Sequence, residues 1–208
     1  MNRSLLTLTM LAGVVFTLGA WIPLKAMVAQ ELLNMAWAES QARQTSKRPW
    51  PWADTWPVAR LELVAAHKSL IVLEGAHGES LAFGPGRMVG SEGRGPVVIA
   101  GHRDTHFRSL ESLAAGNELR LQNRDGDWTR YRVVATRVVD SRNQLLDLAA
   151  LPDDRLLLIT CYPFDAVINH GPLRYVVEAK AVPGAVSPQP DTGKLFADTA
   201  PDLAGRAF

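Results

Sequence analysis

The chain contains a single cysteine, and its position makes it a candidate for nucleophilic chemistry. Cys161 follows the apolar or β-branched run 156–160, which lies between two prolines and has the composition of a buried strand. A residue at the end of a strand lies where loops commonly assemble functional sites. A cysteine thiolate can attack a carbonyl carbon when a neighbouring base moves the protons. The competing interpretation is a structural thiol, because unpaired cysteine often behaves as a small buried hydrophobe.

A histidine occupies a similar position after a second apolar run. Residues 96–100 are Pro-Val-Val-Ile-Ala, and Gly101 and His102 follow directly. If the ends of the two strands lie on the same side of a barrel, His102 and Cys161 form a cysteine–histidine pair across its mouth. His106 and His170, which are expected in loops near this position, are weaker candidates for the same role.

The expected strand order places Arg174 beside the cysteine. The predicted strands 155–160 and 173–181 are consecutive, and the 12-residue connection 162–173 is short enough for an antiparallel pair. In such a pair the start of the second strand lies beside the end of the first. Arg174 is therefore expected next to Cys161, and the competing interpretation is an exposed charge at a strand end.

The segments that carry these residues belong to a predicted all-β domain. From residue 58 onward, short apolar or alternating segments are separated by glycine-containing turns, which is typical of strands and turns. About eight strands at this spacing indicate a small closed or nearly closed barrel. A short helical turn is expected over 104–115. The candidate strands cover residues 58–65, 69–74, 81–83, 96–100, 118–122, 128–139, 155–160 and 173–181.

The first 24 residues predict a transmembrane signal anchor, residues 1–24. Residues 4–24 contain no charged side chain, and these 21 residues match the length of about 20 that a helix needs to span a bilayer. A cleaved signal peptide normally has an apolar core of only about 7–15 residues, and no good Ala-x-Ala cleavage motif lies near the end of this run. Basic residues flank the segment on both sides, so charge counting leaves its orientation open.

Residues 25–57 are expected to connect the anchor to the domain as a helix followed by an extended strap. Over 26–44 an apolar stripe at helical spacing indicates an amphipathic helix. Three prolines between 45 and 57 exclude a helix or a central strand there. The tryptophans of the strap are expected to pin it onto the domain, and a substrate platform is the alternative. The stripe consists of Val28, Leu32, Met35 and Ala36, and the tryptophans are Trp50, Trp52 and Trp56.

Composition limits the classes of function. Lysine and arginine number 22 against 21 acidic residues, a balance that gives no reason to expect a nucleic-acid partner. The acidic residues show no metal-binding spacing, so neither a metal nor a cofactor is predicted. A single cysteine excludes an intramolecular disulfide. Residues 183–208 contain four prolines and little apolar periodicity, and they are expected to form a mobile tail.

Taken together, these residues resemble the sortases, a family of membrane-anchored cysteine transpeptidases. The resemblance covers roughly residues 58–182. It is carried by Leu-Leu-Leu-Ile-Thr-Cys ending at Cys161, by Ala-Gly-His ending at His102, and by Arg174, thirteen residues after the cysteine. The combination is specific, whereas the Leu-x-Thr-Cys string alone is a weak signal.

Finer motifs resemble particular groups within the family. The Gly-Pro-Gly turn at 84–86 and the segments 102–107 and 160–164 resemble class D and related sortases. The strap motif Trp-Pro-Trp-Ala-Asp-Thr at 50–55 is similar to the dedicated sortase systems of proteobacteria. Arg87 departs from the pattern, because relatives often carry histidine after the Gly-Pro-Gly turn.

The resemblance implies a fold and a reaction. The fold is all-β, a sortase-like eight-stranded barrel with short helices, preceded by an N-terminal transmembrane helix. Cys161 would attack the threonine carbonyl of a C-terminal LPxTG-like sorting motif in an exported protein and form a thioester acyl-enzyme. An amine acceptor, which the sequence does not identify, would then receive the acyl group. His102 would move the protons, and Arg174 would hydrogen-bond the substrate or the developing oxyanion.

The resemblance also implies a location and a further contact. Because sorting substrates are exported, a single-pass protein of the cytoplasmic membrane is expected, with its catalytic domain facing outward, into the periplasm if the cell is Gram-negative. Thr160 is a weaker candidate for a substrate contact. Residues 189–193, Gln-Pro-Asp-Thr-Gly, resemble the core of a sorting motif, which suggests the hypothesis of a pseudosubstrate in the tail.

Three other functions compete with this interpretation. An L,D-transpeptidase acting on peptidoglycan also uses cysteine and histidine on a β-rich fold, but its pattern puts Ser-x-Gly before the cysteine, where this chain has Leu-Ile-Thr. A papain-like hydrolase would place its cysteine on a helix, ahead of the histidine. A membrane-tethered barrel that only binds peptides is the non-enzymatic alternative.

Overall fold

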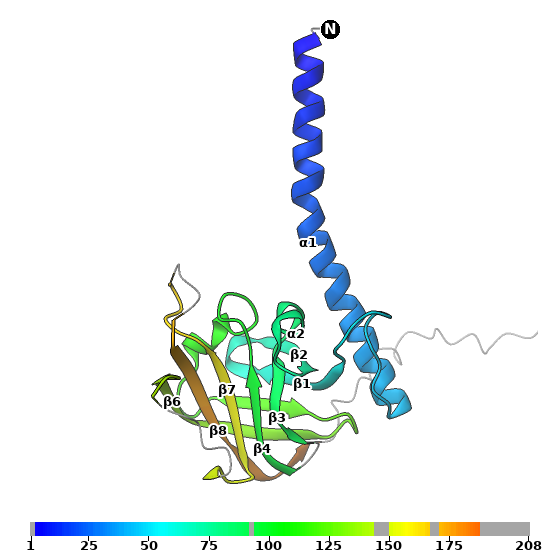
Figure 1. Ribbon diagram of the computed structural model, residues 1–208. Helices are drawn as coiled ribbons and strands as arrows, with labels where there is room; N and C mark the ends of the chain where they lie inside the picture. The colour runs from blue at the N-terminus through cyan, green and yellow to red at the C-terminus, as the bar shows by residue number, and fades with distance from the viewer. Residues whose placement is uncertain (1–2, 92–93, 144–149, 167–170, 188–208) are drawn as a thin grey trace, which may run out of the picture.

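The computed structural model describes residues 3–91, 94–143, 150–166 and 171–187. A long N-terminal helix precedes a small β domain with few other helices (Figure 1). The helices are α1 (Arg3–Arg43), α2 (Gly78–Phe83) and the short 3-10 segments η1 (Val64–Ala66) and η2 (Arg108–Ser112). The strands are β1 (Pro57–Leu63), β2 (Lys68–Glu74), β3 (Gly86–Ser91), β4 (Arg94–Ala100), β5 (Glu118–Gln122), β6 (Trp128–Asp140), β7 (Arg155–Cys161) and β8 (Leu173–Ser187).

The eight strands of the described residues form a closed barrel in the order β1-β2-β3-β4-β7-β8-β6-β5. Two neighbouring pairs, β2 with β3 and β4 with β7, are parallel. The remaining pairs are antiparallel. Closure gives each of these eight strands a neighbour on both sides, although β2 and β3 share only two residue pairs. This arrangement confirms the predicted eight-stranded barrel behind an N-terminal helix.

Strand β7 is buried on both faces, which explains its unbroken apolar sequence. Leu156 and Leu158 point into the main core inside the barrel. Leu157 belongs instead to a small cluster on the outer face, where it packs with Val98 of β4 and Val176 of β8. The run 156–160 therefore contributes side chains to the core inside the barrel and to the cluster on its outer face. Its prediction as a buried strand is confirmed.

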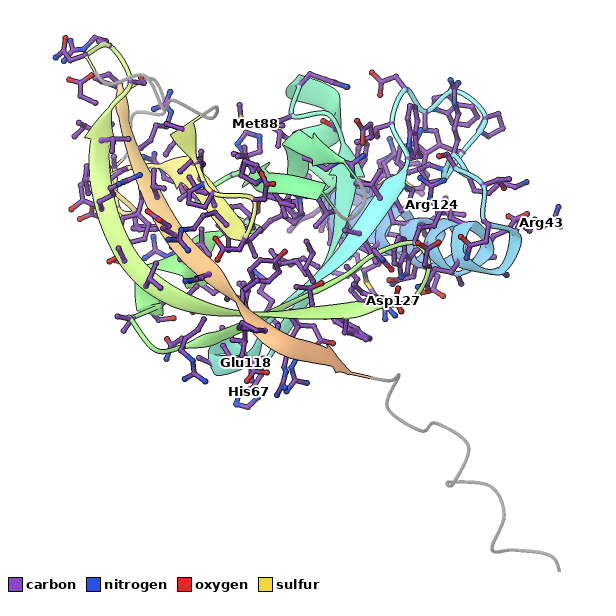
Figure 2. The ribbon with its side chains drawn as sticks, turned by 90° about the horizontal axis from the view of Figure 1, so that it is seen from below. Arg43, His67, Met88, Glu118, Arg124 and Asp127 are labelled. Atoms are coloured by element: carbon purple, nitrogen blue, oxygen red, sulfur yellow. The ribbon has the colours of Figure 1, made fainter. Side chains whose placement is uncertain are left out.

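Helix α1 is continuous, and its C-terminal part packs on the barrel. Leu33 and Trp37 are each 1% exposed and form a cluster with Ile71 and Leu73 of β2. The helix ends at Arg43 because Gln44 adopts a left-handed backbone conformation, with φ of 53°. Figure 2 shows this end of α1, marked by Arg43, beside the turn between β5 and β6 that carries Arg124 and Asp127.

The predicted apolar stripe of this helix is correct for Ala36, which is buried, and wrong for Val28 and Met35. Val28 and Met35 are 51% and 60% exposed, whereas the buried side chains are Leu33, Ala36, Trp37 and Ser40. Apolar residues occupy more than one face of this part of the helix. Helical spacing alone could therefore not decide which of these faces packs against the barrel.

The N-terminal part of α1 is apolar and exposed. The helix from Thr7 onward is long and apolar enough to cross a bilayer, with a mean hydropathy of 1.7 in its most apolar stretch and none of that stretch buried. Exposed apolar side chains in this part include Leu8, Met10, Leu11, Val15 and Phe16. These properties are consistent with the predicted anchor by length and composition.

The segment around the Gly-Pro-Gly turn differs from the prediction. Residues 81–83, expected to be a strand, belong to helix α2, and β3 begins where only a turn was expected. Ser80 fixes the start of α2, since its hydroxyl accepts a hydrogen bond from the His77 backbone N–H at 3.2 Å. Gly86 allows β3 to approach the preceding loop, because a Cβ atom there would lie 2.2 Å from the Gly75 carbonyl oxygen. Neither feature is visible as hydrophobic periodicity.

Strand β8 also extends further than predicted. It runs to Ser187, which pairs with Trp128 of β6, so residues 183–187 are part of the barrel rather than of a mobile tail. The expected tail from 188 onward, including the motif at 189–193, lies outside the described residues.

Two of the three strap tryptophans pin the strap onto the domain as predicted. Trp50 packs edge-on against Phe83 of α2 with ring centroids 4.8 Å apart, and Trp56 packs against the main core. Trp52 does not, because it is 82% exposed. Hydrogen bonds add to this attachment: the Thr55 hydroxyl donates to the Glu74 carbonyl at 2.7 Å.

Replacing the buried tryptophan of α1 should loosen the helix from the barrel. Trp37→Ala is expected to lower the free energy of unfolding by about 3–5 kcal/mol, the usual cost of truncating a buried aromatic side chain. Thermal unfolding in detergent, followed by circular dichroism, measures this effect. Met35→Ala on the exposed side of the same helix is the matched control, and an equal loss from both variants would contradict the packing described.

Candidate active site

Strand alternation places the three candidate residues on the same outer face of the barrel. In the parallel pair, Ala100 of β4 lies opposite Ile159 of β7. Two residues further on, at the ends of these strands, come His102 and Cys161. In the antiparallel pair of β7 and β8, Cys161 lies directly opposite Arg174, as the short connection predicts.

These residues line a pocket of about 440 Å³. His102, Cys161 and Arg174 share it with apolar side chains from five strands and one helix. The apolar part includes Leu81 of α2, Met88 of β3, Val139 of β6, Ile159 of β7 and Val176 of β8. Figure 2 shows Met88 on the side of the barrel away from Glu118 and His67.

The pocket lies on the outer wall near one end of the barrel, which corrects the expected pairing of His102 and Cys161 across the barrel mouth. Ile159 and Val176, which line it, also contact the outer cluster of Val98 and Leu157. The inner face of β7 is occupied by the main core instead. Strand alternation could have predicted this, since residues 157, 159 and 161 share a face.

Thr160 and Gly101 tie the two strand ends together. The Thr160 hydroxyl donates a hydrogen bond to the Gly101 carbonyl at 2.7 Å, and the Gly101 N–H donates to the Ile159 carbonyl at 3.0 Å. Gly101 has no room for a side chain, because a Cβ atom there would lie 2.8 Å from the ring of Phe107. The Thr160 side chain is only 2% exposed and is used in this internal bond, so its role as a substrate contact stays a prediction.

Two arginines that follow the histidine hold the segment that follows the cysteine. Arg103, 3% exposed, donates hydrogen bonds to the carbonyls of Pro163 and Ala166 at 2.7 and 2.6 Å. The Arg108 guanidinium donates to the carbonyl of Phe164. The sequence analysis did not select these two arginines as functional residues. The one available indication was that Arg103 directly follows His102, but a charged residue gives no sign in the sequence that it will be buried.

Arg174 is oriented by its own loop. Its Nη1 donates hydrogen bonds to the carbonyls of Gly171 and Leu173 at 2.6 and 2.9 Å. Among the described residues, Nε and Nη2 have no hydrogen-bond partner. The guanidinium is therefore fixed at one end and can donate to a ligand with the other.

His106 lies close to the site in a different environment. Burial lowers its pKa most, and the nearby charges of Lys68 and His102 lower it further. The Lys68 ammonium donates hydrogen bonds to the carbonyls of His106 and Thr105 at 3.0 and 3.1 Å. His106 is therefore held in a loop beside the pocket that His102 lines, and His170 lies outside the described residues.

Removing the hydroxyl of Thr160 should destabilise the strand pair. Thr160→Val keeps the shape of the side chain but leaves the Gly101 carbonyl without this donor, so a loss of about 1–3 kcal/mol in the free energy of unfolding is expected. Thr160→Ser retains the hydroxyl and should lose less. Chemical denaturation of both variants measures the difference, and a Val variant as stable as the Ser variant would contradict this role.

His106 should contribute to instability in acid. Its pKa in the folded protein is lowered from 6.5, so as the pH falls through 6.5 the unfolded chain takes up the proton first and unfolding is favoured. His106→Gln is therefore expected to show a smaller drop in Tm between pH 7.5 and pH 5 than the parent chain. Parallel melting curves at the two pH values test this, and an unchanged drop would count against it.

Comparison with known sequences shows what this barrel is similar to. The family model of the sortase domain matches residues 61–182, more than half of the chain. Sortase D of Bacillus subtilis (strain 168) is 35% identical over 125 residues, which cover 59% of this chain and 62% of that protein. The chain thus spans less than two thirds of the length of this curated relative.

Solved structures agree with this match. Sortase C-1 from Actinomyces oris has a TM-score of 0.53 and 29% identity, covering 61% of this chain and 75% of that chain. A sortase D5 transpeptidase from Clostridium perfringens has a TM-score of 0.56 at 19% identity, covering 75% and 99%, and supports the fold alone. The resemblance to sortases, class D included, is confirmed, while the likeness to proteobacterial systems stays a prediction. On the match of the sortase domain to most of its barrel, the chain belongs to the sortase family.

Proposed function

We propose that this chain is a membrane-anchored cysteine transpeptidase. It cleaves a C-terminal LPxTG-like sorting motif of an exported protein through a thioester acyl-enzyme and transfers the acyl part to an amine. The observation that carries the proposal is the shared pocket, in which Cys161 and Arg174 lie opposite each other in register and His102 lies two residues after the end of the neighbouring strand β4. A nucleophile, a proton carrier and a fixed cation are the groups that such an acyl transfer needs.

The first half of the reaction forms the acyl-enzyme. The Cys161 thiolate attacks the threonine carbonyl carbon of the substrate, and His102 enters this step as the imidazolium. Its sulfur forms the thioester bond as the carbon–nitrogen bond to the next residue breaks. His102 gives its proton to the departing amine.

The second half of the reaction reverses these roles. His102, now neutral, takes a proton from the incoming amine, which attacks the thioester carbon and displaces the Cys161 sulfur as thiolate. The donors of Arg174 that are not bound to its own loop hydrogen-bond the oxyanion or the substrate backbone. One peptide bond is exchanged for another, so no redox partner or cofactor is consumed.

The lining of the pocket fits a motif with apolar residues next to the scissile bond. Met88, Ile159 and Val176 form its apolar wall, while the polar groups are confined to the strand ends. Apolar pockets with a few convergent polar groups are typical of specific ligand sites. This supports the leucine and proline of an LPxTG-like motif as the part that the wall binds.

The membrane part of the proposal rests on α1. Its apolar, exposed N-terminal part is long enough to cross a bilayer, which supports a single span. The barrel then faces outward from the cytoplasmic membrane, where exported substrates arrive. The L,D-transpeptidase and the non-catalytic peptide-binding barrel remain the competing functions, and the experiment below separates them.

Substitution of the three pocket residues should stop turnover. With a fluorogenic peptide containing Leu-Pro-x-Thr-Gly, Cys161→Ala and His102→Asn are expected to lose at least about a thousandfold in kcat/KM, because each removes a group that acts on the reacting bond. Arg174→Lys keeps the charge but not the planar fork, and a loss of about tenfold or more is expected. His106→Asn, outside the pocket lining, should retain activity and is the matched control.

Mass spectrometry of the intact protein provides the direct test. An adduct of the acylated peptide on Cys161, absent from Cys161→Ala, supports the proposed thioester. Adduct formation with a peptidoglycan stem peptide instead would favour the L,D-transpeptidase, and binding of the sorting peptide with no adduct and no cleavage would favour the peptide-binding barrel.

A further inference from the structure

We propose that α1 acts as a rigid strut that holds the pocket at a fixed, short height above the bilayer. The pocket then reaches polypeptide segments that leave the same bilayer within a few residues of its surface. This inference rests on the membrane anchoring proposed above. It follows from how α1 is joined to the pocket wall, from the short helical distance between the membrane segment and that joint, and from the end of the barrel at which the pocket lies.

The joint between α1 and the barrel is closely packed. Leu33 and Trp37 are almost completely buried against Ile71 and Leu73 of β2. From the apolar N-terminal part to this joint α1 is one continuous helix, and Pro23 lies inside it, where a proline can bend the helix axis without ending the helix. A helix keeps the segments at its two ends at a fixed distance along its axis, whereas a flexible Gly/Ser-rich linker would let that distance vary.

Helix α2 connects this joint to the pocket. The Gln30 side-chain amide of α1 donates a hydrogen bond to the Phe83 carbonyl at the end of α2, at 2.7 Å. The Phe83 ring packs against the cluster that contains Leu33 and Trp37. On the same short helix, Leu81 lines the pocket. The short helix α2 therefore contacts α1 through Phe83 and the pocket through Leu81.

The distance along the strut is short. The uncharged segment ends at Leu24, and Gln30 follows six residues later, which is about 9 Å at 1.5 Å per helical residue. Lys25 lies over the ring of Trp21, with its ammonium 5.1 Å from the centroid. An amphipathic aromatic ring beside a lysine is typical of the membrane interface, which supports this position for the bilayer surface.

The pocket lies at the end of the barrel nearest to that surface. The ends of β4 and β7 and the start of β8 meet there, since Ala100 pairs with Ile159 and Cys161 with Arg174. Figure 1 shows this end of β7 directed toward the same side as the N-terminal half of α1. The opposite end of β7 is Arg155, about 20 Å away at 3.3 Å per strand residue, and Asp153 lies two residues before it.

The single cysteine permits a test that does not depend on activity. A fluorescent donor attached to Cys161 of the full chain in vesicles, with acceptor dyes on the lipid headgroups, reports the height of the pocket. The comparison is the Asp153→Cys, Cys161→Ala chain, which carries the donor at the far end of β7. Transfer from position 161 is expected to exceed that from position 153 by about twofold or more, given the separation of about 20 Å. Equal transfer from both positions would overturn the proposal.

Insertions into the strut test its rigidity. Seven helix-forming residues between Met27 and Val28, which are both exposed, raise the barrel by about 10 Å with almost the same facing. This insertion should reduce transfer from Cys161 about twofold or more, whereas two inserted residues add only about 3 Å and should change it little. An insertion of seven glycine and serine residues at the same place should remove the difference in energy transfer between donors at the two ends of β7. If the helical insertion left transfer unchanged, the strut would be refuted.

The consequence for substrates is measured with the same insertion variants in vesicles. A membrane-embedded substrate carries the Leu-Pro-x-Thr-Gly motif at increasing spacer lengths from its own membrane segment. The parent chain should prefer short spacers, and the seven-residue helical insertion should shift the optimum to longer ones. Cleavage of the free peptide in solution should stay within about twofold, because the pocket itself is unchanged. A spacer optimum that does not move overturns the strut, whereas a free peptide that no variant cleaves overturns the proposed function instead.

Discussion

The parallel pairing of β4 with β7 is the constraint on which the rest of the site depends. These strands are far apart in sequence, and their alignment rests on ladder hydrogen bonds and on the buried bond from the Thr160 hydroxyl to the Gly101 carbonyl. Once they are in register, alternation puts His102 and Cys161 on the same outer face. Strand β8 pairs antiparallel with β7, and the register of this pair places Arg174 opposite Cys161.

The two faces of these strands pack in different hydrophobic clusters. The inner face carries Leu156 and Leu158 into the main core, and the outer face carries Leu157 into a second, smaller cluster. The pocket continues that outer cluster through Ile159 and Val176. Its floor is therefore set by side chains that are packed in the absence of ligand, so a peptide meets a preformed apolar wall and loses little free energy in ordering it. Arg103, buried behind the site, holds the loop after the cysteine in the same manner.

The sequence predicted the strands that bear the site better than it predicted their surroundings. The apolar runs before His102 and Cys161, and the short connection to Arg174, are local patterns, and strand length and alternation follow from them directly. Helix α2 and strand β3 were mispredicted because they depend on a Ser80 hydrogen bond and on the close approach of Gly86 to Gly75, which leave no periodic signal. The face of α1 that packs on β2 was mispredicted for a related reason, since several stripes of that helix are apolar and only the partner surface selects one.

Barrel closure has a consequence for when the site can form. The first strand, β1, pairs with β2 and β5, whereas the last strand, β8, closes the structure between β6 and β7. The register that places Arg174 opposite Cys161 involves β8 as far as Lys180, and the pairing of β8 with β6 continues to Ser187. Such long-range pairings are slow to form compared with local ones. The thiol of Cys161 therefore gains its cationic neighbour only when β8 closes the barrel, so the complete set of pocket groups exists only in the finished fold.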